Sequence, residues 1–187
     1  MAQTLAGGPG AFSGRRSAPN PPVLNWAIWI GAAGFIAILI IAAVFDPTIR
    51  WLHAFQALMY LAVIALTARG SRWGLYLGAS VALFWNYGAM FVNSFFRGGL
   101  RALSQSFAQG RVVHPDQIIA VFAVGFHFLM VAACVAAYLR LPRKSWTDLP
   151  AWLATLMGQA AYFAAVMALF QPRYLAQFPK MLHPHGL

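Results

Sequence analysis

The side chains of this sequence that could do chemistry lie inside long apolar segments. A buried amide or imidazole in hydrocarbon is costly unless it has a hydrogen-bonding partner. The candidate ligand-binding residues are Gln56, Tyr60, Asn86, Asn93, His127, Gln159 and Tyr162. Amides and phenols orient small neutral or aromatic ligands, and aromatic neighbours supply stacking surface. The set therefore predicts either a polar pocket within a membrane or hydrogen bonds that join helices.

Helical spacing gathers several of these groups. Asn86 and Asn93 are seven residues apart, which places them on one face of a continuous helix. A second polar row falls within roughly 60° on a helix and consists of His53, Gln56, Tyr60 and Thr67. At about 1.5 Å of rise per residue, Asn86, His127 and Gln159 all lie near mid-membrane. We therefore expect these three to be close neighbours.

His127 could also be the single axial ligand of a porphyrin or pigment. Ala120 and Ala123 precede it at helical spacing and leave room for a flat ring. The five residues from Ala123 to His127, Ala-x-x-x-His, are similar to the pigment-ligating segment of bacterial antenna polypeptides. A hydrogen-bonded core histidine is the favoured interpretation, and no cofactor is expected. His53 is expected at a different depth, which disfavours a bis-histidine haem.

Carboxylates are scarce: the sequence has no Glu, and only Asp46, Asp116 and Asp148. Each lies close to a proline at the start of an apolar run, which is typical of helix caps. If all three are caps, none remains for proton pumping, ion coupling or two-carboxylate catalysis. We predict no catalytic residue and no metal site, and we lean against an enzyme.

Composition predicts an all-α, polytopic membrane helix bundle. Of 187 residues, 61% are hydrophobic and 9% charged, against about 25% charged in soluble domains. The predicted regions are a disordered tail (1–22), a bundle (23–170) with spans at 23–45, 48–68, 73–96, 116–139 and 149–170, and an interfacial C-terminal tail (171–187). Within 97–116, the spacing of Leu100, Leu103 and Phe107 predicts a short amphipathic helix that lies at the interface or docks a partner.

Small residues mark faces for close helix packing. Gly74 and Gly78 form a small pair early in 73–96. The face on 23–45 consists of Ala27, Gly31 and Gly34. The stripe on 149–170 consists of Ala154, Gly158, Ala161, Ala165 and Ala168. Such faces favour burial of the chain among other helices.

The net charge of +10 does not indicate nucleic-acid binding, because the basic residues flank apolar runs, where they contact lipid headgroups. Their tighter clusters favour a cytoplasmic N-terminus in a bacterial inner membrane. The expected partners are the bilayer and other membrane subunits. The favoured function is that of a small, non-catalytic subunit of a membrane complex. The alternatives are a binding or transport module for a small neutral molecule or lipid, and a pigment or haem protein using His127.

Overall fold

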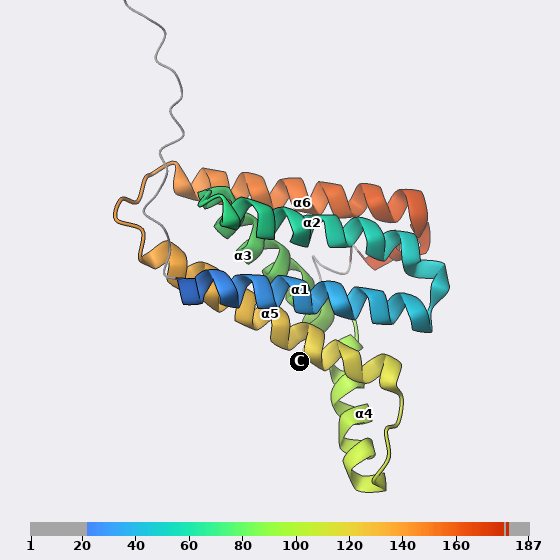
Figure 1. Cartoon of the computed structure of the whole chain (residues 1–187). Helices are drawn as coiled ribbons and strands as arrows, with labels where there is room; N and C mark the ends of the chain where they lie inside the picture. Colours follow the sequence, from blue (N-terminus) through green and yellow to red (C-terminus); the bar gives the residue numbers. More distant parts are fainter. Residues whose placement is uncertain (1–21, 178, 180–187) are drawn as a thin grey trace, which may run out of the picture.

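Helices form all the regular structure in residues 22–177 and 179, the part of the chain that the computed structural model describes (Figure 1). The α-helices are α1 (Pro22–Phe45), α2 (Arg50–Ala68), α3 (Arg72–Tyr87), α4 (Phe95–Gln109), α5 (Pro115–Leu139) and α6 (Asp148–Phe170). The short helical turns are η1 (Pro47–Ile49), η2 (Gly88–Val92) and η3 (Pro172–Gln177). Residues 1–21 of the predicted N-terminal tail lie outside this part, as do residues 178 and 180–187 of the predicted C-terminal tail.

Five of these segments are long and apolar enough to cross a membrane, in agreement with the five predicted spans. They are Pro22–Phe45, Pro47–Ala68, Arg72–Val92, Pro115–Leu139 and Asp148–Phe170. The chain runs up and down, so that α1, α3 and α6 begin at one end of the bundle, called here the N-terminal end. The helices α2 and α5 begin at the other end, called the C-terminal end, where α4 projects away from the bundle axis (Figure 1).

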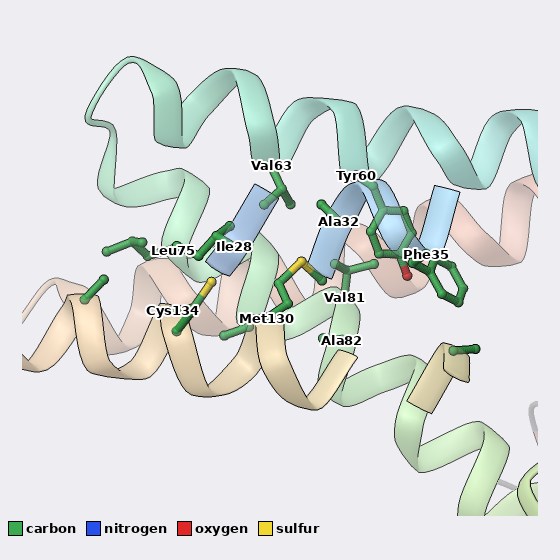
Figure 2. Packing of buried hydrophobic residues seen from close by; sticks show 14 of the residues in the cluster. Ile28, Ala32, Phe35, Tyr60, Val63, Leu75, Val81, Ala82, Met130 and Cys134 are labelled. Carbon is green, nitrogen blue, oxygen red and sulfur yellow. The ribbon is translucent and has the colours of Figure 1, made fainter. Parts of the chain in front are cut away.

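The central element is α3, which packs against α2, α5 and α6, while α1 packs against α2 and α5. In the most apolar part of each span, 61% of the α3 residues are buried, against 17% of those in α6. Figure 2 shows the apolar core between these helices, in which Phe35 of α1 lies beside Tyr60 of α2 and Val81 of α3 and Met130 of α5 also take part. Cys134 belongs to this core as a small, buried side chain.

Glycines allow the closest helix crossings. A Cβ added to Gly31 would lie 2.8 Å from the carbonyl oxygen of Phe126 and 2.9 Å from Cβ of Met130, so α1 and α5 nearly touch here. A Cβ on Gly78 would lie 2.8 Å from Sγ of Cys134 and 3.1 Å from Val63. The predicted small faces of the first and third spans are thus confirmed as packing surfaces.

Replacing Gly31 with alanine is expected to lower the free energy of unfolding by about 1–3 kcal/mol, because the added methyl meets the backbone of α5. Gly158 of α6 is the matched control, since a Cβ there meets no atom within 4 Å. Gly158→Ala should be neutral or slightly stabilising through helix propensity. Equilibrium unfolding in mixed detergent and dodecyl sulfate micelles measures both. Equal effects of the two substitutions would contradict this account of the α1–α5 crossing.

The third span ends earlier than predicted. After Tyr87 the chain makes a π-helical turn, in which the N–H of Asn93 donates to the carbonyl of Gly88 over 2.9 Å. Asn93 is extended, and its Oδ1 accepts the backbone N–H of Phe95 at the start of α4 (3.0 Å). The predicted single helix over 73–96 is therefore wrong at its end, because the Asn93 side chain competes for backbone hydrogen bonds. The face that Asn86 and Asn93 were expected to share does not exist.

The amphipathic helix predicted within 97–116 is confirmed as a helix, α4. Its inner face packs on α5 through Gly99, where a Cβ would lie 2.7 Å from the carbonyl oxygen of Gln117. Of the three apolar residues that suggested an amphipathic helix, Leu103 is half-buried, whereas Leu100 is exposed and Phe107 is 81% exposed. The part of the apolar face of α4 that carries Leu100 and Phe107 is therefore left uncovered by the described part of the chain.

Candidate functional site

The best-defined pair among the predicted polar residues is Tyr60 of α2 with His127 of α5. The phenol oxygen lies 2.7 Å from Nε2 of the imidazole, and both side chains are completely buried. Tyr60 belongs to the polar row on α2, which forms the buried face of that helix together with Gln56 and Thr67. Three of the four residues of the predicted row therefore face the bundle interior. The fourth, His53, is half-buried, and its Nδ1 lies 3.0 Å from the carbonyl oxygen of Leu39.

Aromatic rings enclose His127. The ring of Phe35 from α1 lies 4.0 Å from the imidazole, centroid to centroid, and that of Trp85 from α3 lies 4.7 Å away. Neither ring was among the predicted site residues, although Trp85 adjoins Asn86, which was predicted to lie near mid-membrane. With Nε2 bonded to Tyr60 and both flanks covered, a porphyrin could reach His127 only if these rings moved.

Two polar residues of α6 bond to backbone carbonyls of neighbouring helices. Nε2 of Gln159 donates to the carbonyl of Ser80 in α3 over 3.0 Å, and the hydroxyl of Tyr162 donates to the carbonyl of Phe55 in α2 over 2.8 Å. These bonds attach α6 to the rest of the bundle. They do not bring Gln159 and Tyr162 to the Tyr60–His127 pair.

Asn86 stands apart from both groups. Its side chain is buried, and neither Nδ2 nor Oδ1 has a hydrogen-bond partner among the described residues. Asn86 follows Ser80 by six residues, so the two point about 120° apart on α3, and Asn86 faces away from Gln159. No hydrogen bond among the described residues joins Asn86 to His127 or to Gln159. Gln56 is buried as well, and its Oε1 has no partner in the described part of the chain.

A cluster of polar side chains at the N-terminal end of the bundle surrounds Asp148. One carboxylate oxygen accepts the hydroxyl of Tyr76 from α3 (2.7 Å), and the other accepts that of Tyr138 from α5 (3.1 Å). The second oxygen also accepts the N–H of Ser145 (2.8 Å), and Arg72 lies 3.4 Å from the first. We call Asp148, Arg72, Tyr76 and Tyr138 the carboxylate cluster.

The interpretation of every aspartate as a simple helix cap holds for Asp46 and fails for Asp148. Asp116 lies in the first turn of α5, whose cap position is His114. Asp46 accepts the backbone N–H of Thr48 (3.0 Å) and its hydroxyl (2.6 Å), which keeps the pKa of Asp46 below its ordinary value. Asp148 instead receives side chains from α3 and α5 and so ties three helices together. The sequence did contain a signal for this cluster. It places Tyr76, Tyr138 and Arg72 near the span ends that meet on the same side of the bundle as Asp148.

An apolar cleft of about 250 Å³ adjoins the carboxylate cluster. It is lined by Leu75, Tyr76, Ala79, Val135, Tyr138, Asp148, Leu149 and Trp152. The cleft lies over α3, between α5 and α6, which both pack on α3 without packing extensively on each other. Because Asp148 already accepts four donor groups, it is poorly placed to act as a base, and the cleft is suited to holding an apolar group.

The described part of the chain brings together no group of three His, Cys, Asp or Glu side chains that could hold a metal ion. Comparison with known proteins adds no functional assignment, since no family model, curated protein or solved structure matches this chain.

Proposed function

We propose that this protein is a small integral membrane subunit of a larger complex, without catalytic activity of its own, and that it docks through α6. One observation carries the proposal: the small-residue stripe of α6 is exposed along its length. It consists of Ala154, Gly158, Ala161, Ala165 and Ala168. The inner face of α6 uses other residues, namely Gln159, Phe163 and Val166.

Close packing explains why such a stripe needs a partner. Small residues let two helix backbones approach in a membrane, where van der Waals contact supplies much of the association energy. This chain uses Gly31 and Gly78 in that way, each with a neighbouring helix nearly in contact. At Gly158 the space is open to a distance of 4 Å. A helix from another subunit would fill it.

The proposed location is a bacterial inner membrane, with the N-terminal end of the bundle in the cytoplasm. Two basic groups at that end support this orientation: Arg69 with Arg72 after α2, and Arg140, Arg143 and Lys144 after α5. The exposed apolar face of α4 would then rest on the opposite membrane surface. Leu100 and Phe107 would enter the headgroup region.

Co-purification in mild detergent tests docking through α6. The wild-type chain should carry a stoichiometric membrane partner, and Gly158→Leu should lose it while the chain keeps its thermal stability. Gly125→Leu is the matched control, because Gly125 lies on the exposed face of α5 and also has open space around it. A clean monomer in every detergent tested, or equal partner recovery with both variants, would refute the proposal.

A further inference from the structure

We propose that the cleft between α5 and α6 is a specific binding site for one anionic phospholipid. Its acyl chain would lie in the cleft, and its phosphate would lie beside the basic loop that joins the two helices. This site is separate from the proposed docking face of α6, because the cleft borders Leu149 and Trp152, whereas the stripe follows Ala154 and Gly158 on the exposed side.

The shape of the cleft favours a chain-like apolar occupant. At about 250 Å³ it is smaller than the roughly 300–1,000 Å³ of a typical small-molecule pocket. Its walls are formed by aliphatic side chains, including Leu75 and Val135, and by the ring of Trp152. Because α3, α5 and α6 are all long and apolar enough to span a membrane, a groove between them faces hydrocarbon. A lipid acyl chain is the apolar group that is always present there.

Basic side chains stand beside one end of the cleft. Nζ of Lys144 lies 6.0 Å from the centre of the Tyr138 ring, and Tyr138 lines the cleft. This ammonium group therefore stands beside the cleft, at the N-terminal end of the bundle. Arg140 and Arg143 lie in the same connection with exposed side chains. Basic groups beside a groove between spans are a known arrangement for binding anionic headgroups.

The nearest opposing charge is already compensated. Asp148 lines the cleft, but it pairs with Arg72 and accepts the hydroxyls of Tyr76 and Tyr138. Lys144 is therefore left to face an added anion. Trp146, in the same connection, is 99% exposed, as expected of a side chain that sits among lipid headgroups. Apolar walls, a basic rim and an interfacial tryptophan together match a phospholipid with a negative headgroup.

Native mass spectrometry of the full chain tests the site, with dioleoyl phosphatidylglycerol and dioleoyl phosphatidylcholine as probes. The wild-type protein should retain one phosphatidylglycerol and bind it more tightly than phosphatidylcholine. The triple variant Arg140→Gln, Arg143→Gln, Lys144→Gln should lose about tenfold or more in affinity for phosphatidylglycerol. Arg97→Gln, Arg101→Gln, Arg111→Gln removes three charges at the C-terminal end and should leave that affinity unchanged.

A second variant tests the apolar half of the site. Val135 lines the cleft and is 45% exposed, so Val135→Trp can fill the groove without disturbing the core. This variant should bind phosphatidylglycerol more weakly, although Arg140, Arg143 and Lys144 are all retained. Equal binding of the two lipids by the wild-type chain would overturn the proposal. A Val135→Trp variant that binds phosphatidylglycerol as tightly as the wild-type chain would also overturn it. The same is true of a Val135→Trp variant in which only self-association or partner recovery changes.

Discussion

Replacing Asp148 with asparagine is expected to lower the free energy of unfolding by about 3 kcal/mol. The carboxylate accepts hydrogen bonds from Tyr76 and Tyr138 and pairs with Arg72. Asparagine keeps the size of the side chain but removes the charge and one acceptor oxygen. Arg72 then loses its ion-pair partner at a part-buried position, which is why the loss exceeds that of one neutral hydrogen bond.

Unfolding in mixed micelles of mild detergent and dodecyl sulfate, followed by circular dichroism, measures this change. Asp46→Asn is the control, and its effect should be much smaller. The hydrogen bonds of Asp46 stay within one turn, and its ion pair with the exposed Arg173 is long, at 4.0 Å. Tyr76→Phe should have an intermediate effect, because it removes one 2.7 Å hydrogen bond and leaves the ion pair. If Asp148→Asn cost no more than Asp46→Asn, the carboxylate cluster would not be holding α3, α5 and α6 together.

The second large effect is expected from His127→Ala, at about 3 kcal/mol. The substitution removes a ring that lies 4.0 Å from that of Phe35 and 4.7 Å from that of Trp85, at the meeting point of four helices. It also leaves the hydroxyl of Tyr60 without its imidazole partner. Because the His127 side chain is completely buried, neither lipid nor water can fill the cavity left by the missing ring unless the surrounding helices move.

Tyr60→Phe separates the hydrogen bond from the packing. It keeps the ring against Phe35, whose centroid is 4.6 Å away, and removes only the bond to His127. Interhelical hydrogen bonds in membranes contribute about 0.6 kcal/mol on average and about 1.7 at most. The double variant Tyr60→Phe, His127→Ala then gives the coupling free energy between Tyr60 and His127. Equal losses for Tyr60→Phe and His127→Ala would mean that the hydrogen bond, and not ring packing, gives His127 its stabilising role.

Predictions from local pattern agree well with the fold. A span is recognised from its own length and apolar content, and the five predicted spans correspond to the five long apolar segments. Helical periodicity also identified the buried face of α2 and the close-packing face of α1, where Gly31 meets α5. These features depend on residues that are neighbours within one helix, so the sequence carries them directly.

Predictions about which residues meet across helices were less successful. Equal depth in a membrane does not place two side chains together, because each helix can also rotate about its axis. Asn86 and Gln159 have overlapping depths, yet Asn86 points about 120° away from Ser80, the residue that Gln159 contacts. Asp148 looked like a helix cap by its position beside a proline, and only the approach of α3 and α5 revealed its wider role.

The sequence by itself determined that this protein is an all-helical chain with five apolar spans, and which face of several helices is polar or small. The tertiary structure decided which faces are used. It paired Tyr60 with His127 inside an aromatic enclosure, gathered three other side chains around Asp148, and left the small stripe of α6 exposed. The physical reason is that periodicity is a property of one helix, whereas helix rotation and the choice of neighbours depend on the packing of the whole bundle.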